Sequence, residues 1–346
     1  MNEQIICNRC CMDKSAEEIS FNENGVCNFC IQAQKSLKEI EAEKDNLYSV
    51  LEQIKKDGKG KDYDILIGLS GGVDSSTALH YAVLFGLRPL CFSVDTGYNK
   101  ADADENIMKL VEGLKVPFYR YVIDLKKFKE LQGAFLRSGV PNIEIPTDHV
   151  LMAVTYEIAN QYGIKWILSG GNVASESIMP PSWGANARDL VHIKDIYKRM
   201  TGKKLTGLPM CSLLKWNWYK NVKKIKTLYL LDYFEYNREE SEQMLIEKYE
   251  FKSTGGKHEE NYFTWWFQNF FLFEKFGFDK RKAHLSSLIN SGQITRSEAL
   301  FRLSAEPVYP KLGIEERVMK YPKTRHEEFA HDNYDSIAKL IKLCKL

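Results

Sequence analysis

The stretch ILIGLSGGVDSSTALH at residues 65–80 constrains the fold of this chain more than any other feature of its sequence. A short apolar run leads into the loop Ser70–Ser76, and a segment with helical spacing follows at once. Two glycines let backbone N–H groups point inward without a Cβ in the way, and the helix start adds free N–H groups and a positive dipole end. The stretch therefore predicts a strand, a phosphate-binding loop and a helix. No lysine closes the loop, so it is not the GxxxxGK[ST] loop of nucleoside triphosphatases.

Apolar runs of strand length alternate with helical patterns through the first half of the chain. The predicted strands are 63–69, 88–94, 117–123 and 165–169, and the predicted helices are roughly 75–85, 103–114 and 148–162. This alternation predicts an α/β fold, a parallel twisted sheet with helices on both faces. Because ligands bind at the carboxyl ends of such strands, the loops 70–76, 95–99 and 169–176 should line one crevice.

The loop SGGVDSS resembles the PP-loop of the ATP pyrophosphatases, a family that cleaves ATP between its α- and β-phosphates. All seven positions are present between a predicted strand and helix, which argues against an ordinary Gly-Ser turn. The resemblance implies an adenine nucleotide alpha hydrolase-like core in which Asp74 helps to place Mg²⁺. It also implies that ATP contacts the whole loop, namely Ser70, Gly71, Gly72, Val73, Asp74, Ser75 and Ser76.

Two further loops fit this resemblance. In the family, adenosine contacts lie at the end of the second strand, which makes Asp95 and Asn99 candidates, although their segment DTG is also a common turn. In LSGGNVASE, the residues Gly170, Asn172 and Glu176 are spaced as in NAD synthetase, whose glutamate binds a second Mg²⁺. Mg²⁺ prefers carboxylates and phosphate oxygens, so this glutamate and the loop aspartate would suit bound ATP. Alternatively, the glutamate is a solvated acid at a helix start.

Four of the eight cysteines form two CxxC pairs, Cys7, Cys10, Cys27 and Cys30. Sixteen residues separate the pairs, which is close to the C-x2-C-x15–20-C-x2-C pattern of zinc sites, and the intervening EISFNENGVC predicts a hairpin. Two CxxC turns place four thiolates at the corners of a tetrahedron, which Zn²⁺ favours in structural sites. The metal would supply folding energy to a segment too short for a core of its own. An iron–sulfur cluster is the alternative, and Cys11 is out of register with both pairs.

Composition and patterning divide the chain into four parts. The predicted parts are a zinc-binding module at 1–32, a helical linker at 33–60, a nucleotide-binding core at 61–177 and a largely helical substrate-binding part at 178–346. No apolar run approaches the roughly 18–20 residues that span a bilayer, and the N-terminus has no secretory pattern. We therefore expect a cytoplasmic protein that binds no membrane. A net charge of +2 does not demand a polyanionic partner such as nucleic acid.

Three further segments carry a closer resemblance. They are PTDHV at 146–150, GGKHEENYFTWWFQ at 255–268 and FGFDKRKAHLSSLINSGQITRSEAL at 276–300. With the cysteine module and the phosphate loop, they resemble the N-acetyl sugar amidotransferases, a PP-loop group that acts in making bacterial surface sugars such as O-antigen components. The resemblance implies that the acetamido oxygen of an N-acetylated, nucleotide-linked sugar attacks the α-phosphorus of ATP and releases pyrophosphate. Ammonia then displaces AMP and leaves an acetamidine.

Such a reaction needs cations near the phosphates, and the C-terminal segments offer several. We expect Lys257 and His258 to act in catalysis together with Asp74, because the two glycines before them let the backbone approach a ligand. Further substrate or phosphate candidates are Asp148, His149, Glu259, Arg281, Lys282 and His284. The alternatives are solvated charges for the arginine and lysine, and a helix cap beside a structural histidine for the Asp-His pair. The aromatic run 263–273 has helical spacing and predicts core packing.

The sequence predicts no glutaminase activity within the chain. The first cysteine is a zinc-ligand candidate, and Cys91, Cys211 and Cys344 lack the strand–helix elbow and downstream His-x-Glu that a glutaminase nucleophile needs. By resemblance, ammonia should come from a separate glutaminase subunit. The zinc module or a nearby surface would dock that partner.

Two alternatives belong to other functional classes. A PP-loop tRNA-modifying enzyme of the thiolase or lysidine type shares the loop. Thiolases of that kind usually need further paired cysteines, however, and the net charge here is near zero. A non-catalytic ATP-binding regulator shares the fold, but it has no need of Asp74, Glu176 and the cationic loop 255–258 together. Pyrophosphate release separates the enzyme from the regulator.

Overall fold

The computed structural model describes residues 6–184 and 186–334. Its centre is a parallel five-stranded sheet with the strand order β3-β2-β1-β4-β5. The strands are β1 (Ile65–Gly68), β2 (Pro89–Asp95), β3 (Phe118–Val122), β4 (Trp166–Ser169) and β5 (Lys226–Tyr229). The strand order reverses between β1 and β4, and α/β sheets bind ligands in the crevice at the carboxyl ends of such strands.

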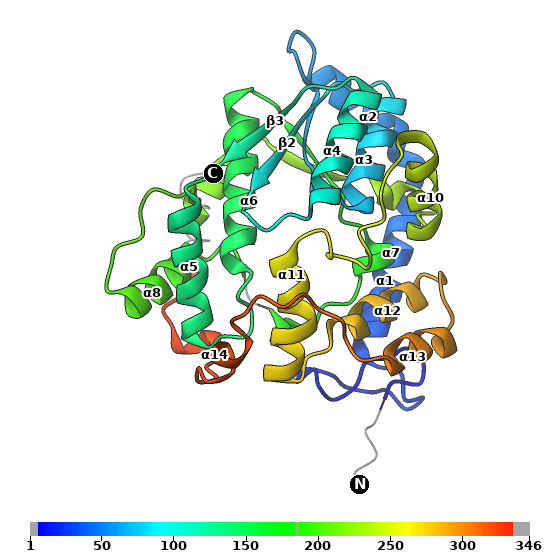
Figure 1. Ribbon diagram of the computed structural model, residues 1–346. Coiled ribbons are helices and arrows are strands. Elements are labelled where there is room, and N and C mark those ends of the chain that lie inside the picture. Colours follow the sequence, from blue (N-terminus) through cyan, green and yellow to red (C-terminus); the bar gives the residue numbers. More distant parts are fainter. Residues whose placement is uncertain (1–5, 185, 335–346) are drawn as a thin grey trace.

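Helices cover both faces of the sheet (Figure 1). Alternate strand residues divide between two hydrophobic clusters, so that Ile65 and Ile67 of β1 join one cluster and Leu66 joins the other. The first cluster contains residues of α2 (Leu47–Asp57), α3 (Val73–Leu84), α4 (Ala101–Leu114) and α10 (Arg238–Tyr249). The second contains residues of α5 (Leu125–Ser138), α6 (Ile145–Gln161), α8 (Leu190–Thr201), α9 (Leu213–Asn221), α11 (Tyr262–Trp266) and the π-helical segment η4 (Phe267–Phe276).

A third group of helices ties the N-terminal segment to the C-terminal part. These helices are α1 (Asn28–Glu43), α7 (Val173–Glu176), α12 (Lys280–Asn290) and α13 (Arg296–Ser304). Figure 1 shows the N-terminal loops, in blue, beside α12 and α13, in orange. The short elements are η1 (Lys44–Asn46), η2 (Pro181–Trp183), η3 (Leu230–Tyr233), α14 (Glu315–Met319) and η5 (His326–Glu328). Within the described residues, no helix has both the length and the apolar character needed to cross a membrane.

The predicted α/β fold with a parallel sheet is confirmed, and the structure adds α5 to the core. The range 222–236, for which the sequence left helix and strand both open, contains β5, which lies outside the range 61–177 assigned to the core, so the sheet extends into the C-terminal part. The end of that part, beyond residue 334, lies outside the described residues. The range 33–60 is helical, but it is not a free linker, because Leu51 and Ile54 of α2 are buried against the sheet.

The aromatic run 263–273 packs into the core, as its spacing predicts. The buried rings are Phe263, Trp266, Phe267, Phe270 and Phe271. They belong to α11 and η4, which cover one face of the sheet and carry the segment that precedes α12. The run therefore fixes the position of the C-terminal segments over the crevice.

Candidate active site

The phosphate loop lies between β1 and α3, beside the point where the strand order reverses. Gly71 has φ +77°, and a Cβ there would lie 2.2 Å from the backbone oxygen of Ala103, so only glycine fits. Gly72 caps α3 without a side-chain hydrogen bond, which leaves the first N–H groups of the helix available to a ligand. The loop after β4 packs directly against it, because a Cβ on Gly170 would lie 2.7 Å from the backbone nitrogen of Ser75. Two glycines thus allow both loops to meet in one site.

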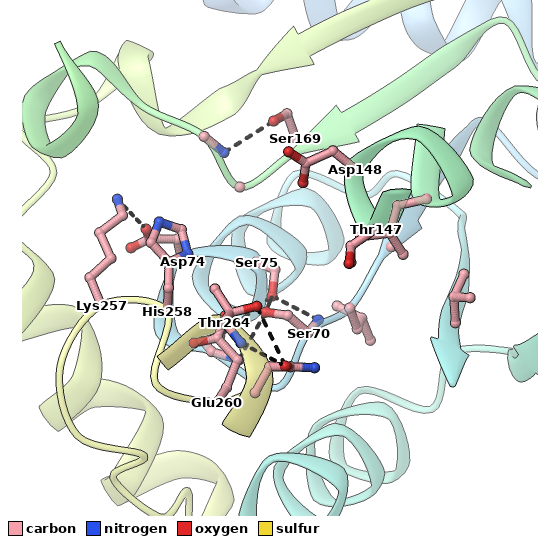
Figure 2. A pocket seen from close by; sticks show the side chains of 18 of the residues that line it. Ser70, Asp74, Ser75, Thr147, Asp148, Ser169, Lys257, His258, Glu260 and Thr264 are labelled. Atoms are coloured by element: carbon pink, nitrogen blue, oxygen red, sulfur yellow. Dashed lines mark hydrogen bonds and ion pairs between the residues drawn. The ribbon is translucent and has the colours of Figure 1, made fainter. Parts of the chain in front are cut away.

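A cavity of about 610 Å³ opens over this loop (Figure 2). This volume falls in the usual range of roughly 300–1,000 Å³ for small-molecule and cofactor sites. The predicted site residues that line the cavity are Ser70, Gly72, Val73, Asp74, Ser75, Asn99, Asp148, Gly170, Glu176, Lys257 and His258. Gly71 and Ser76 lie behind this lining, and Ser76 is buried. The structure therefore brings together segments that lie far apart in the sequence.

The ammonium group of Lys257 joins two carboxylates in the cavity. Its Nζ lies 3.0 Å from Oδ2 of Asp74 and 2.8 Å from Oε1 of Glu176, and it donates to Oγ of Ser175 at 2.7 Å. Burial opposes the charge of Lys257, but the two carboxylates outweigh burial and raise its pKa. Burial also opposes the charge of Asp74, but Lys257 and the Tyr236 hydroxyl, which donates to Oδ1, hold its pKa below the usual value. Lys257 and Asp74 are therefore both charged at neutral pH.

Two histidines beside this centre are neutral. The ring centroids of His258 and His284 lie 5.5 Å apart, and Nε2 of His258 lies 3.8 Å from Oε1 of Glu176. Burial lowers the pKa of His258 to about 4, and burial together with His258 lowers the pKa of His284 well below its usual value. The expectation that they act as cations is therefore wrong, because a neutral imidazole only donates one hydrogen bond and accepts another. His284 and Glu259 line a smaller cavity of about 280 Å³ rather than the main one.

Another wall of the main cavity carries a second group of ionisable side chains, at the start of α6. Glu144 is 8% exposed and accepts hydrogen bonds from the hydroxyls of Thr147 at 3.4 Å and Thr264 at 2.7 Å. Asp148 follows one helical turn later, and its side chain is open to the cavity. The cavity walls nevertheless displace much of the water around its carboxyl group. Burial and Asp148 raise the pKa of Glu144 to about 7, and burial raises that of Asp148 to about 6. Lys280 of α12 lines the same cavity, and burial lowers its pKa.

The raised pKa of Glu144 predicts a pH-dependent difference in stability between the wild type and the Glu144→Gln variant. Between the ordinary value of 4.5 and the folded value of about 7, the folded state binds more protons than the unfolded state. The free energy of unfolding of the wild type therefore falls as pH rises through this window, by up to about 3 kcal/mol relative to the variant. Thermal unfolding from pH 5 to pH 8 measures it. Glu157→Gln, an exposed change on α6, should run parallel to the wild type, and a parallel Glu144→Gln curve would contradict the assignment.

The end of β2 contributes one of its two predicted residues to the cavity. Asn99 lines the cavity, and Nδ2 of Asn261 donates to its Oδ1 at 3.2 Å and to Oγ1 of Thr96 at 3.4 Å. Asp95 does not line the cavity, because its Oδ1 accepts the backbone N–H of Gly97 at 2.8 Å and closes the turn. For Asp95, the alternative of an ordinary turn residue is therefore correct.

Two other candidates also take structural roles. His149 is fully buried: its Nδ1 lies 2.6 Å from the carbonyl oxygen of Ala187, and its Nε2 accepts the backbone N–H of Cys211 at 3.1 Å. Asn172 caps α7, since its Oδ1 accepts the backbone N–H of Ser175 at 2.9 Å. Neither side chain lines the cavity, because its polar atoms are taken up by the backbone of neighbouring segments.

The basic pair on α12 turns away from the main cavity. Arg281 pairs with Asp279 at 2.8 Å, and Lys282 pairs with the buried Asp13 of the N-terminal segment. The cation that α12 contributes to the cavity is Lys280, the residue directly before this pair. The cation of this segment that faces the site is therefore Lys280, one residue before the predicted Arg281.

Sequence reasoning also missed Glu144, Tyr236 and Thr264. Glu144 stands four residues before Asp148, which is the spacing of one helix face, and this was the signal that could have identified it. Thr264 lies in the segment 255–268 that the sequence singles out, but nothing in that segment marks its hydroxyl. Tyr236 carries no comparable signal, because it reaches the site only through the path of the folded chain. Tyr236 follows η3, and Thr264 lies on α11.

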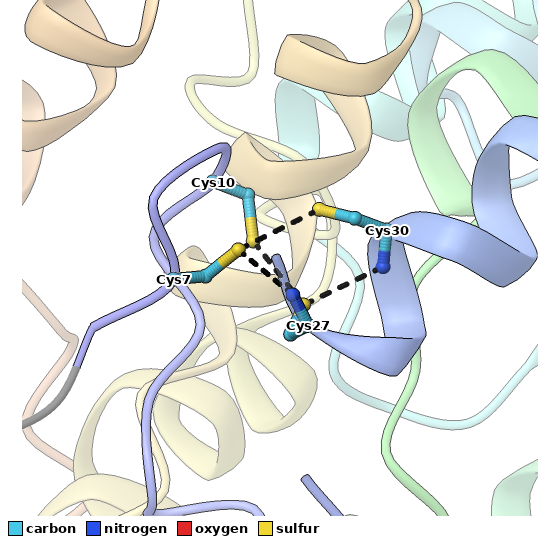
Figure 3. Close-up of side chains that lie close together, drawn as sticks. All are labelled: Cys7, Cys10, Cys27 and Cys30. Atoms are coloured by element: carbon cyan, nitrogen blue, oxygen red, sulfur yellow. Dashed lines mark hydrogen bonds between the residues drawn. The ribbon is translucent and has the colours of Figure 1, made fainter. Parts of the chain in front are cut away.

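The four predicted zinc ligands converge in the structure (Figure 3). The sulfur atoms of Cys7, Cys10, Cys27 and Cys30 all lie within 4.8 Å of one another, and all four residues are buried. Sγ of Cys7 lies 4.0 Å from that of Cys30, and Sγ of Cys10 lies 3.7 Å from that of Cys27. A tetrahedral zinc site with Zn–S bonds of about 2.3 Å needs sulfur separations of about 3.8 Å. Backbone N–H groups donate to the sulfurs, as at Cys27 N to Cys7 Sγ, 3.2 Å, so the donor set fits a four-sulfur metal site.

This cysteine module is anchored to α12 and α13. Nδ2 of Asn290 donates to Sγ of Cys30 at 3.2 Å, and the guanidinium of Arg296 donates to the backbone oxygens of Cys7 and Cys10 at 3.1 and 3.2 Å. Cys11 is no member of the cluster and packs beside α12 and α13 instead. The module therefore supports the helix whose first residue is the cavity lysine.

The structure places the loop SGGVDSS between β1 and α3 of a parallel sheet, the arrangement expected from its resemblance to the PP-loop. Residues 260–340 match the family described as LPS biosynthesis protein WbpG-like, C-terminal domain. We call this part of the chain the WbpG-like domain because of this similarity, and it includes η4, α12 and α13.

The matches to individual proteins have low identity or cover only part of the chain. An uncharacterised protein of Methanocaldococcus jannaschii is 26% identical over 161 residues, which cover 45% of this chain and 55% of that relative. Among solved structures, an NH3-dependent NAD synthetase from Campylobacter jejuni is 14% identical over 40% of this chain and 58% of its own, with a TM-score of 0.29. An NMN synthetase from Francisella tularensis is 15% identical over 58% of this chain and 98% of its own, with a TM-score of 0.29. These values support no conclusion about activity.

Proposed function

We propose that this chain is an ATP-dependent amidotransferase that converts the acetamido group of an N-acetylated sugar into an acetamidino group. One observation carries the proposal: the WbpG-like domain and the phosphate loop line the same cavity. Asn261, Thr264 and Lys280 come from the WbpG-like domain, and Asp74 and Ser75 come from the loop. A domain related to LPS biosynthesis thus meets a site suited to ATP. We propose cytoplasmic action on a nucleotide-linked sugar.

In the proposed reaction, the phosphate loop binds ATP, and Asp74 and Glu176 would hold Mg²⁺. Their fit to a cation is supported by Lys257, whose single ammonium both carboxylates already contact. When bound with ATP, Mg²⁺ would neutralise part of the negative charge of the phosphates. An amide carbonyl is a poor electrophile, so the acetamido oxygen attacks the α-phosphorus first and pyrophosphate leaves. The protein acts here mainly by alignment and charge stabilisation, with Lys257 beside the leaving pyrophosphate and His258 as a neutral hydrogen-bonding group.

Ammonia then adds to the activated carbon, and AMP leaves. We propose that a separate glutaminase subunit supplies it. Burial raises the pKa of Cys91 to about 12 and that of Cys211 to about 11, so neither forms the thiolate that a glutaminase needs at neutral pH. Cys344 lies outside the described residues. The cysteine module, which we propose binds structural Zn²⁺, remains a candidate docking surface for that subunit.

The proposal is tested with purified protein, ATP, Mg²⁺ and ammonium chloride, against a panel of nucleotide-linked acetamido sugars and, separately, bulk tRNA. AMP, pyrophosphate and sugar mass are followed together. We expect one sugar to trigger AMP formation and to exchange its amide oxygen for NH. AMP formation with tRNA alone would replace the proposal with tRNA modification. Absence of AMP with every acceptor, also with a glutaminase partner present, would leave only the non-catalytic regulator.

A further inference from the structure

The Glu144–Asp148 wall has no role in the phosphate chemistry described above. Both carboxyl groups belong to the start of α6, four residues apart, and they lie on one face of that helix. Figure 2 shows Asp148 and Thr147 on α6, across the cavity from Asp74 and Lys257. The Thr264 hydroxyl of the WbpG-like domain donates to Oε2 of Glu144, so the two parts of the chain build this wall together. The wall is therefore formed by side chains from the start of α6 and from α11 that are held together by a hydrogen bond.

The charges on this wall exclude phosphate as its ligand. Lys280 of α12 lines the cavity, and its positive charge lowers the pKa of both carboxyl groups. In the part of the chain that the structure describes, no lysine, arginine or histidine nitrogen lies within 4.0 Å of a Glu144 or Asp148 carboxylate oxygen. Two carboxylates against one lysine leave a net negative wall, which repels phosphate oxygens. The non-phosphorylated end of a substrate, or a cation, fits here instead.

The proposed reaction produces a cation from a neutral group. When the acetamido oxygen bonds to the α-phosphorus and the P–O bond to pyrophosphate breaks, the amide becomes a positively charged imidate. The lone pair of ammonia then forms a C–N bond. The new nitrogen loses one proton, and the C–O bond breaks with its electron pair on AMP. The product is a planar acetamidinium ion, whose parallel N–H donors match a carboxylate as a guanidinium does.

We propose that Glu144 and Asp148 form the subsite that binds the acetamido group, stabilises the positive charge that develops on it, and accepts the proton that the incoming nitrogen releases. This inference rests on the proposed function and adds the residues that act on the sugar side of the reaction. Fixed charges placed where charge develops are a major source of rate enhancement. Their raised pKa values, about 7 and about 6, suit groups that are ionised near neutral pH and still able to take a proton. The positive charge of Lys280 lowers the pKa of both carboxyl groups and so favours their ionised forms.

The test compares a cation with a neutral molecule of the same shape. Acetamidinium chloride and acetamide are titrated, by NMR, into the full-length wild type and into the Glu144→Gln, Asp148→Asn and Glu157→Gln variants. Loss of one charged partner should weaken acetamidinium binding by about 10- to 100-fold, and acetamide binding much less. Glu157→Gln should match the wild type, since Glu157 is exposed on α6 and does not line the cavity.

Equal loss of both molecules, or no loss of either, would overturn the proposal. Asp148→Asn guards against misfolding, because its side chain faces the cavity rather than the core. The binding experiment needs neither ATP nor turnover, so its failure is distinct from failure of the proposed function. In a turning-over enzyme, amidine formation should also rise with pH between about 6 and 7 in the wild type and lose that rise in the Glu144→Gln variant.

Discussion

The Lys257→Met variant should release pyrophosphate about 100- to 1,000-fold more slowly than the wild type, because it loses a preorganised cation beside the phosphates. Lys257 contacts Asp74 and Glu176 at 3.0 and 2.8 Å, and its side chain is 11% exposed. Methionine keeps the length and the apolar stem but removes the charge. The two carboxylates then repel each other and the ATP phosphates. Acceptor-dependent pyrophosphate release, measured at saturating ATP, shows the effect.

Lys252→Met is the matched control for this variant. Lys252 lies five residues earlier, pairs with Glu105 at 2.5 Å on the surface and does not line the cavity. Exposed ion pairs contribute only about 0–1 kcal/mol, so this change should leave turnover and melting temperature nearly unchanged. Turnover of Lys257→Met equal to that of the control would show that the ammonium is a structural counter-ion and takes no part in the reaction.

The Cys27→Ser variant should lose the Zn²⁺ that we propose the module binds, and with it most of the stability of the N-terminal half. Structural zinc contributes roughly 10–16 kcal/mol in small zinc domains, which matches or exceeds the usual 5–15 kcal/mol stability of a whole domain. The module is also anchored to α12 through Asn290 and Arg296. Loss of the metal should therefore displace Lys280 from the cavity and reduce activity, although no cysteine of the module lines that cavity.

Metal analysis and thermal unfolding measure this prediction, with Cys11→Ser as the control. Cys11 is buried beside the same module but lies outside the four-sulfur cluster, so its replacement should keep the metal and cost only a few kcal/mol at most. A Cys27→Ser protein with full metal content and an unchanged melting temperature would contradict the structural role of the cluster.

The parts of the site that sequence could predict are those encoded locally. The glycines of the phosphate loop and the CxxC turns have spacings that follow from the backbone conformations they form, so both were identified without the fold. The position of Lys257 was also predictable, since two glycines precede it. Each of these features needs only a few neighbouring residues to specify it.

The remaining parts depend on the path of the whole chain. Whether Lys280 or Arg281 faces the cavity is decided by the angle of α12, which the cysteine module and η4 set. His149 and Asp148 are adjacent in sequence, and only the packing of α6 decides that the histidine is buried and the aspartate faces the cavity. β5 joins the sheet from a region with little periodicity, because its neighbour β4 supplies the backbone hydrogen bonds that stabilise it.

The central claim is that the acetamido oxygen attacks the α-phosphorus of ATP. An N-acetyl sugar labelled with ¹⁸O at the acetamido carbonyl tests it directly, in a reaction with ATP, Mg²⁺ and ammonia whose products are analysed by mass spectrometry. The account predicts one ¹⁸O atom in the phosphate of AMP, none in pyrophosphate, and a sugar in which NH replaces oxygen. Formation of ADP and phosphate, or AMP without the label, would contradict it.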